Sequence, residues 1–372
     1  MPYLLPLLGL AMIAVLQWRR WQHDQAALRE LKARPLPAVT LGNTPTVSPL
    51  PKVSVLVAGW NEAQMIEDHI GSFLNLRYPN RELILCVGGE DDTYTRAVAC
   101  AAPNIHILQQ PSGEGKQQAL KRCLEVASGE IFYLTDADCL YDDESFERTL
   151  SPIISEGQEV CTGGSRPLDR QLDNPLALHV WFTDLYSRSR WGEYTNGILG
   201  RNAALTRRVL DTIGGFHVPV PTGTDYHLAK QVLRHGYSIR HAAGSAIQTR
   251  FAETLTKYRT QQTRWLRNIM LHGIQFKEYR EAAQAVLASL IGMSVLALSV
   301  IGLIMGPPLL TAVLLLWVFI LISRVRYMRF GEVLTGVPFG RGYLLLPLFT
   351  LLDFGLWSLT LVQSIVFNSE LW

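Results

Sequence analysis

Three long apolar runs near the C-terminus restrict the fold of this chain more than any other feature. Residues 282–305 carry no charge, a Pro307-Pro308 pair interrupts the chain, and residues 309–323 and 343–367 continue the pattern with a single acid, Asp353. A helix needs about 20 apolar residues to cross the roughly 30 Å core of a bilayer. Buried helices of a soluble domain are the alternative, but three such runs in succession favour membrane helices.

The N-terminus carries a fourth apolar run. Residues 2–18 are uncharged and are followed at once by Arg19 and Arg20. As a helix this run would be about 26 Å long, just enough to span. It lacks the basic leader and the small-residue site of a cleaved signal peptide, so a signal anchor is predicted. Trp18 and Trp21 would suit the membrane–water interface.

The basic residues indicate an orientation. Arg19 and Arg20 follow the first run, and four further arginines are expected in one loop before the last run: Arg324, Arg326, Arg329 and Arg341. Basic loops stay in the cytoplasm. Four spans therefore predict an integral protein of a bacterial-type inner or plasma membrane, with residues 19–280 in the cytoplasm. The predicted parts are an anchor at 1–18, a linker at 19–50, an α/β domain at 51–252, an amphipathic helix at 253–280 and a membrane bundle at 281–372.

Charge and cysteine content exclude other classes of protein. The net charge of +2 gives no argument for nucleic acid as a partner. The five cysteines lie at least fourteen residues apart and form no C-x-x-C pair. That spacing suits neither a zinc site nor a redox pair, and a cytoplasmic domain would keep the thiols reduced.

The segment between the membrane runs alternates strands with helices. Apolar runs predict strands at 53–58, 82–87, 105–108 and 131–135; helices are predicted at 62–76, 93–100 and 116–128, the last closed by Gly129 as its C-cap. This alternation predicts an α/β domain with a largely parallel sheet. Ligands of such sheets bind beyond the carboxyl ends of the strands. Polar clusters follow three of these strands: Asn61-Glu62, residues 88–92 and residues 136–138.

Asp136 and Asp138 end the fourth predicted strand. Residues two apart in extended chain project to the same side, so the two carboxylates would converge and repel unless a cation lies between them. Oxygen ligands indicate Mg²⁺ or Mn²⁺. By itself the pattern more often marks a polar turn that caps the next helix, because short motifs match by chance.

The stretch "QQPSGEGKQQ" contains Gly115-Lys116 at a predicted helix start. A Walker loop needs a glycine where Gln110 stands and a Ser or Thr where Gln117 stands, so no P-loop is predicted. Lys116 could still meet an anion at the helix N-terminus.

Two later stretches hold candidate site residues. Asp225 precedes a predicted helix that runs to about Arg234, where the alternative is a simple N-cap. The stretch "ETLTKYRTQQTRWLRNIMLHG" is amphipathic, which also fits a helix lying on anionic lipid. In it Gln261, Arg264 and Trp265 share one helical face. An arginine beside a tryptophan can hold a phosphate and stack on a sugar ring.

Together these stretches resemble the membrane-bound family 2 glycosyltransferases of the GT-A fold, which include polysaccharide synthases and ceramide glucosyltransferase-like enzymes. The resemblance extends from about Val53 to Arg267 and is carried, in order, by "VSVLVAGWNE", "LILCVGGEDD", "GEGKQQAL", "TDAD", "IGGF", "TGTD" and "QQTRW". It implies a GT-A nucleotide-sugar-binding domain at 51–252. It also implies hexosyl transfer from a nucleotide sugar, UDP-linked by the family, to a lipid or saccharide acceptor.

The resemblance also implies roles for single residues. Ala58, Asn61 and Glu62 would line the nucleotide pocket, with an acid of Glu90, Asp91 and Asp92 near the base and Lys116 near the nucleotide. Asp136 and Asp138 would hold Mg²⁺ or Mn²⁺ on the diphosphate. Asp225 would be the general base of an inverting transfer. Arg264 would steady the diphosphate, and Trp265 with Gln261 would form the acceptor site.

Departures from the family pattern leave the acceptor open. The usual T-E-D reads Thr224-Asp225 without the Glu, and the "LILCVGGEDD" stretch is closer to the ceramide glucosyltransferase type. Single transfer to a membrane lipid is therefore weighed against a processive synthase that exports a β-linked polymer, which could act as a homo-oligomer. Trp317, Trp357 and Asp353 are the only candidates for lining its channel. A catalytically inactive membrane subunit is the third alternative.

Overall fold

A computed structural model describes residues 4–37, 50–189, 191–218, 220 and 223–366. The chain forms two compact units, and each is made of segments that are not consecutive in the sequence. Unit 1 comprises Met1–Arg34, Asp169–Arg190 and Phe251–Trp372, and unit 2 comprises Pro35–Leu168 and Trp191–Arg250. The segment 169–190, expected within the α/β domain, thus belongs to unit 1.

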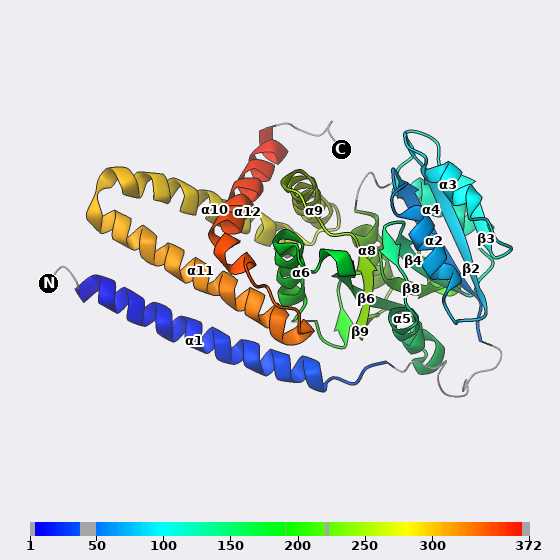
Figure 1. The fold of residues 1–372 in the computed structure, drawn as a ribbon, viewed down its shortest axis with the longest axis horizontal. Helices are drawn as coiled ribbons and strands as arrows, with labels where there is room; N and C mark the ends of the chain where they lie inside the picture. The colour runs from blue at the N-terminus through cyan, green and yellow to red at the C-terminus, as the bar shows by residue number, and fades with distance from the viewer. Residues whose placement is uncertain (1–3, 38–49, 190, 219, 221–222, 367–372) are drawn as a thin grey trace. The chain divides into compact units, whose positions relative to one another are not determined.

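Unit 2 is built around one mixed sheet (Figure 1). In spatial order its strands are β3 (Ile105–Gln109), β2 (Arg81–Gly88), β1 (Val53–Trp60), β4 (Ile131–Asp136), β8 (Ala203–Thr206), β6 (Val160–Pro167), β9 (Ile239–Thr249) and β5 (Cys139–Leu140), with β7 (Tyr194–Thr195) also paired to β9. The first four run parallel, as the sequence predicts. β8 lies antiparallel to β4 and β6, so the sheet is mixed beyond β4.

Helices cover both faces of this sheet. Strands β1 and β2 are buried on both faces, which is why they read as continuous apolar runs. The helices of unit 2 are α2 (Ile66–Leu74), α3 (Thr93–Ala99), α4 (Lys116–Val126), α5 (Asp143–Glu156), α7 (Arg207–Thr212) and α8 (Thr224–Arg234). Side chains of α2 and α5 pack on one face, and those of α4, α7 and α8 on the other.

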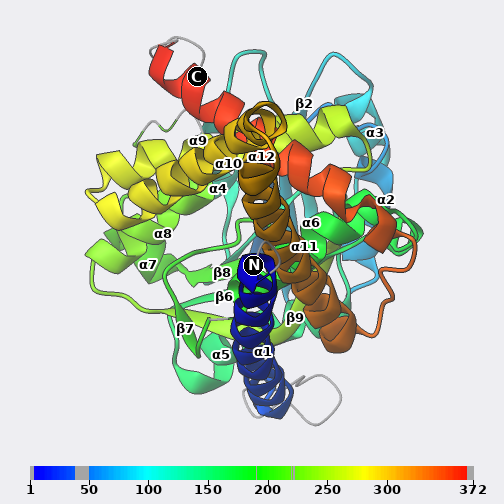
Figure 2. The same cartoon turned by 90° about the vertical axis from the view of Figure 1, so that its left-hand side faces the viewer.

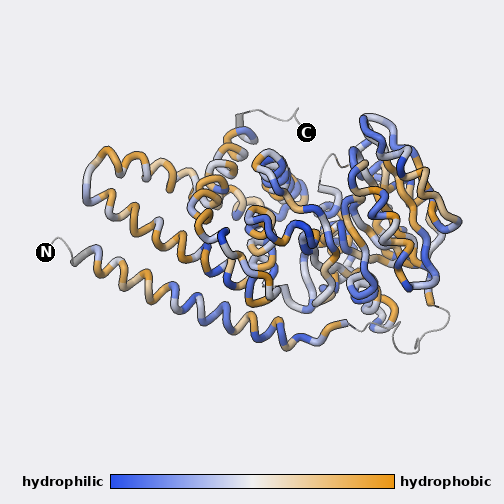
Figure 3. The backbone as a smooth tube through the Cα atoms, viewed as in Figure 1, coloured by the Kyte–Doolittle hydropathy of each residue, from blue (hydrophilic) through white to orange (hydrophobic). Residues whose placement is uncertain are grey.

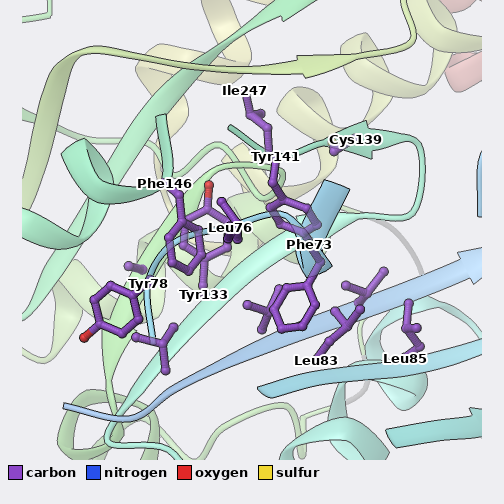
Figure 4. Close-up of a cluster of buried hydrophobic side chains, with 14 of the residues drawn as sticks. Phe73, Leu76, Tyr78, Leu83, Leu85, Tyr133, Cys139, Tyr141, Phe146 and Ile247 are labelled. Carbon is purple, nitrogen blue, oxygen red and sulfur yellow. The ribbon is translucent and has the colours of Figure 1, made fainter. Parts of the chain in front are cut away.

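An aromatic cluster fills the space between α2, α5 and the sheet (Figure 4). Tyr133 of β4 lies between Phe146 and Tyr141, with ring centroids 4.8 and 6.4 Å away. Phe73 of α2 contacts Tyr141 edge-on. All four rings are buried, so this cluster fixes α2 and α5 against the strand that ends in Asp136.

Two local predictions in unit 2 are wrong. The helix predicted from residue 116 ends at Val126, with Ala127 as its C-cap, so Gly129 does not cap it. A side-chain carbon at Gly129 would lie 2.6 Å from the Ser54 hydroxyl, so close packing on β1 explains this glycine. The helix predicted from residue 62 begins only at Ile66, because residues 61–65 form a turn.

Unit 1 is helical. Its elements are α1 (Leu4–Ala33), the short helix η2 (Asp169–Gln171), α6 (Pro175–Arg188), α9 (Leu255–Gln275), α10 (Tyr279–Met305), α11 (Pro307–Thr335) and α12 (Gly342–Val366). Helices α10 and α11 form a hairpin that turns at Gly306-Pro307, as the Pro-Pro pair predicts (Figure 1). Among the described residues, α10, α11 and residues 342–364 of α12 are long and apolar enough to cross a membrane.

The N-terminal helix is not one of these three candidate spans. It continues without a break past Trp18 to Ala33, and its hydrophobic first half gives way to a mixed second half (Figure 3). It runs parallel to α11: a side-chain carbon at Gly9 would lie 2.7 Å from Leu315, Gln17 donates to the Phe319 carbonyl at 2.9 Å, and Asp24 accepts from Arg326 at 2.9 Å. The span at 2–18 therefore stays a prediction.

The predicted arginine-rich loop is also wrong. Arg324, Arg326 and Arg329 lie within α11, and Arg324 and Arg326 are buried. In a loop these arginines would be hydrated. Here buried carboxylates neutralise them instead: Asp353 pairs with Arg324 at 2.9 Å, and Asp24 pairs with Arg326. Arg341 lies in the turn before α12.

Candidate functional site

The candidate site lies at the carboxyl ends of the parallel strands of unit 2, hereafter the carboxyl edge. Register aligns the strand ends: Ala58 lies opposite Asp136 on one side and Cys86 on the other, and Trp60 lies opposite Gly88. The predicted residues of β1, β2 and β4 therefore come to one edge, as expected for a sheet of this kind.

Asn61 ties the ends of β1 and β2 together. It adopts a left-handed backbone (φ +59°), its N–H donates to the Gly88 carbonyl at 3.1 Å, and its side-chain oxygen accepts from the Glu90 N–H at 2.8 Å. Asparagine tolerates this conformation better than most residues. Asn61 therefore shapes the edge through its backbone and side chain together.

Of the three acids after β2, only Asp91 is anchored. Its carboxylate accepts from the Ala63 N–H at 3.2 Å and from the Thr93 N–H at 3.1 Å. Burial alone would raise the pKa of Asp91, but these hydrogen bonds and one from the Thr93 hydroxyl outweigh it and lower the pKa. Glu90 and Asp92 are exposed. The structure thus singles out Asp91 as the acid held in a fixed position.

Asp136 is the last residue of β4, but Asp138 lies in the turn that follows, so the two residues do not share the extended chain expected from the sequence. Like charge still acts between their carboxylates. Burial, followed by the neighbouring Asp136 carboxylate, raises the pKa of Asp138, against the opposing effects of Arg201 and Arg250. The Thr249 hydroxyl donates to Asp138 at 3.2 Å, and Lys116 Nζ forms an ion pair with Asp136. The two carboxylates are held close together by partners on α4 and β9.

This pair fits a divalent cation that a diphosphate helps to hold. Mg²⁺ is commonly held by one or two carboxylates together with substrate phosphates. Among the described residues there is no group of three or more His, Cys, Asp or Glu that could hold a metal ion. The donor set at Asp136 and Asp138 is therefore suited to a metal that arrives with phosphate oxygens.

Glu62 and Arg250 form a second pair at this edge. Arg250 donates to Glu62 at 2.6 Å, and both side chains are about four-fifths buried (20% and 19% exposed). Burial, with a further effect of Asp138, raises the pKa of Glu62 to about 7 even though Arg250 opposes it. Arg250 was not predicted from the sequence, because the strand it follows, β9, was not recognised there. The rule of polar residues at strand ends would have found it.

Asp225 lies in the first turn of α8, and Gly223 in a left-handed conformation is the N-cap. Asp225 is therefore not the N-cap residue itself, although its carboxylate accepts the first-turn N–H of Tyr226 at 3.0 Å. Asp225 acts electrostatically on Lys116, whose pKa it and Asp136 raise against the effect of burial. A side-chain carbon at Gly200 would lie 2.8 Å from the Asp225 Cβ, so the glycine leaves the room that Asp225 occupies. Asp225 and Asp136 thus act on the same lysine.

Gln261, Arg264 and Trp265 lie on α9 in unit 1. Arg264 is exposed, whereas Trp265 is partly buried against an apolar cluster that includes Tyr258 and Phe349. Thr263 of the same turn is hydrogen-bonded by Thr360 of α12 at 3.4 Å. The helical face expected from the sequence is present.

A cavity of about 720 Å³ lies at the opposite edge of the sheet. It is lined by Pro51, Ile131 and Thr206 at strand ends and by Arg208 paired with Glu159. None of the predicted site residues lines it. The clustered carboxylates, rather than this cavity, mark the candidate site.

Residues 51–268 match the family model described as "Glycosyltransferase like family 2". This segment is more than half of the chain. The chain belongs to this family.

Named relatives agree with this assignment. Glycosyltransferase AglE of Haloferax volcanii is 26% identical over 206 residues, which are 52% of this chain and 66% of that protein. An N-acetylglucosaminyltransferase of Rhizobium meliloti is 23% identical over 334 residues, 82% of this chain and 76% of that protein. The chain spans just under two thirds of the length of AglE.

A solved structure shows the same fold. The mannosyltransferase PcManGT of Pyrobaculum calidifontis, in complex with GDP-Man and Mn²⁺, superposes with a TM-score of 0.57 at 17% identity, covering 98% of this chain and all of that one. This family 2 member therefore has the GT-A fold expected from its sequence, together with three long apolar C-terminal helices.

Proposed function

We propose that this protein transfers a hexosyl unit from a nucleotide sugar to a membrane lipid or saccharide acceptor, with inversion at the anomeric carbon. The observation that carries the proposal is the convergence of Asp136, Asp138, Lys116 and Asp225 at the carboxyl edge. Family membership supports the reaction class, and the nucleotide sugar bound by PcManGT supports the donor class. UDP as the donor nucleotide rests on the family resemblance, whereas PcManGT binds a GDP-sugar.

The site residues of unit 2 would have two roles, binding of the nucleotide sugar and proton transfer. Asn61, Asp91 and Glu62 would shape the wall against which a nucleoside lies, and Lys116, at the start of α4, would bind phosphate. Asp136 and Asp138 would hold Mg²⁺ or Mn²⁺, which supplies positive charge to the departing diphosphate. Arg264 of unit 1 is proposed to add to that charge, and Trp265 with Gln261 to contact the acceptor.

Asp225 is proposed as the general base. In the transfer, the bond from the anomeric carbon to the diphosphate oxygen breaks and a bond to the acceptor oxygen forms. The acceptor proton passes to the Asp225 carboxylate. The first turn of a helix favours a carboxylate electrostatically, and Gly200 leaves this side chain space. Attack opposite the leaving group gives a β-linked product from an α-linked donor.

Contacts inside unit 1 favour single transfer over polymer export. Trp317 donates to Ser299 at 2.9 Å, Trp357 lies under the Arg324 guanidinium at 5.8 Å, and Asp353 is buried and paired with Arg324. The three side chains considered for a polymer channel are thus engaged in packing. These contacts favour a membrane lipid over a growing polymer as the acceptor.

The test is donor turnover by the purified full chain in nanodiscs with Mg²⁺ or Mn²⁺. UDP-, GDP- and dTDP-sugars are offered with membrane lipid extract, and release of nucleoside diphosphate is measured. We expect Asp225→Asn to lose about 10²–10⁴-fold in rate, while Asp68→Asn, an exposed aspartate on α2, retains full activity. Sizing the product separates glycolipid from polymer. Nucleotide binding without turnover of any donor would favour the inactive-subunit alternative, and an α-linked product would overturn the inverting mechanism.

A further inference from the structure

The two ends of α12 both contact the base of the α10–α11 hairpin, the part remote from its Gly306 turn. At its start, the Tyr343 hydroxyl donates to Glu332, near the end of α11, at 2.8 Å. At its far end, Leu361 packs against Ala285 in the first turns of α10 and against Met270 of α9. If α12 ran parallel to α10 and α11, one of its ends would lie near the Gly306 turn.

The middle of α12 contacts the hairpin between these points. Asp353 accepts from Arg324 of α11 at 2.9 Å, and a side-chain carbon at Gly292 of α10 would lie 3.2 Å from the Phe354 Cα. Helix α12 therefore crosses from α11 to α10. The two views of unit 1 agree, because α12 runs across the hairpin in both (Figures 1 and 2).

The hairpin itself has the length to cross a bilayer. Helices α10 and α11 contain 27 and 29 residues, about 40 Å each, against a hydrocarbon core of about 30 Å. If the hairpin crosses, its turn lies at one membrane surface and its base at the other. Both ends of α12 then lie at the base surface.

Charged and aromatic residues place that surface at the level of α12. Arg324 follows the start of α11 by about 26 Å of helix, close to the thickness of the core. On α1, the exposed Trp18 and Trp21 stack at 5.0 Å, and Arg20 between them lies over the Phe319 ring of α11. Tryptophan and arginine are typical of the membrane–water interface. Asp353 paired to Arg324 would be costly at the bilayer centre but is readily accommodated here.

One face of α12 is exposed in both halves of the helix. Its exposed residues fall on one stripe, Leu344, Leu348 and Leu351 in the first half and Leu359 and Val362 in the second, while residues 352–358 are buried or half-buried. The opposite face, with Leu346, Phe349 and Asp353, is buried in unit 1. An apolar stripe backed by protein in this way suits a helix that lies at the boundary of head groups and acyl chains.

We propose that α12 lies in the membrane surface at the base of the hairpin, with its leucine stripe in lipid, and does not cross the bilayer. Only α1, α10 and α11 cross. The C-terminal end of α12 then stays at the membrane surface from which α10 starts, whereas four spans would place it at the opposite surface. Length and hydropathy alone make α12 a candidate span; its contacts decide otherwise.

Membrane depth along α12 tests this proposal. Single cysteines at Leu344, Leu351 and Leu359 are labelled with a fluorophore in nanodiscs whose lipids carry quenchers at graded depths. Four native cysteines are buried, and Cys100→Ser removes the half-buried one. We expect Leu344 and Leu359, near the two ends of α12, to lie at the same depth, with Leu351 showing whether the middle of the helix lies deeper. A spanning helix would separate Leu344 from Leu359 by about 22 Å, and a graded depth of that size would overturn the proposal.

The hairpin provides the matched control. Cysteines at Leu290, Leu298 and Ile304, all exposed on α10, should differ in depth by about 21 Å from first to last. Equal depths there would show that the hairpin does not cross, which would also overturn the proposal. As an independent readout, alkaline phosphatase fused after the last residue should be inactive in bacteria, and inserted after Gly306 it should be active.

Discussion

The protein contains two groups of acidic and basic side chains that differ in how they are balanced. In unit 1, Asp353 is 2% exposed and meets Arg324 at 2.9 Å, His179 at 3.5 Å and the Tyr258 hydroxyl. At the carboxyl edge of unit 2, Asp138 meets a second carboxylate, and the pKa values of Asp138 and Glu62 are both raised.

The difference separates a structural role from a functional one. A buried carboxylate that is paired with Arg324 and hydrogen-bonded by Tyr258 is satisfied by the fold itself. Carboxylates that repel each other cost folding free energy and persist where a ligand relieves the cost. Substitution should therefore have opposite consequences in the two groups.

The largest expected effect is at Asp138. We expect Asp138→Asn to lower donor turnover by about 10²–10³-fold, because the charge stabilisation supplied through a metal is worth several kcal/mol. The same change should leave the metal-free melting temperature unchanged or higher, since it removes the repulsion with Asp136. Calorimetry and turnover are measured on one preparation, with Asp68→Asn as the control. A lower melting temperature would place Asp138 with the structural group.

The next largest effect is at Asp353. We expect Asp353→Asn to destabilise the protein by about 3–5 kcal/mol, because Arg324 is left buried without its counter-charge. Thermal unfolding in detergent measures this. Glu30→Gln, which breaks the exposed pair with Arg34, should change stability by less than about 0.5 kcal/mol. Equal effects of the two variants would remove the contrast between buried and exposed pairs.

A smaller effect is expected at Tyr258, the residue through which Asp353 holds α9. Tyr258 lies one turn before Gln261, so Tyr258→Phe should loosen the helix that carries Arg264 and Trp265. We expect up to about a tenfold loss in kcat/KM, because Arg264 and Trp265 are both held less firmly and a hydrogen bond to a charged group is worth about 1.5 kcal/mol.

Tyr343→Phe is the matched control for this prediction. It removes the same kind of bond, from a phenol to the Glu332 carboxylate, but from α12 to α11 instead of α9. Hydrogen exchange across residues 255–270 should quicken in Tyr258→Phe only. If both variants behave alike, Tyr258 has no special part in placing α9.

A gradual effect, spread over a pH window, is expected at Glu62. In the metal-free protein its pKa is raised from 4.5 to about 7, so between these values the folded state binds more protons than the unfolded state. The free energy of unfolding should therefore fall as pH rises through this window, by up to about 1.4 kcal/mol per pH unit. Glu62→Gln should flatten the slope, and Glu67→Gln, exposed on α2, should not. An unchanged slope in Glu62→Gln would show that Glu62 titrates normally.

Much of this protein is determined by its sequence alone. The apolar runs at β1, β2 and β4 and the polar residues after them predicted the parallel strands and the edge where Asn61, Asp136 and Lys116 meet. The Pro-Pro pair predicted the turn between α10 and α11. These features succeed because a strand buried on both faces and a helix break each leave a local pattern.

Only the tertiary structure decided which distant residues meet. Arg250 finds Glu62 across 188 positions, residues 169–190 join unit 1, and α12 lies across its hairpin although its composition suits a span. Arg324 and Arg326 became helical and buried because Asp353 and Asp24 arrive from elsewhere in the chain to neutralise them. The hydropathy of a segment indicates whether it could lie in a membrane. Which residues it contacts, and in which direction it runs, depend on how the whole chain folds.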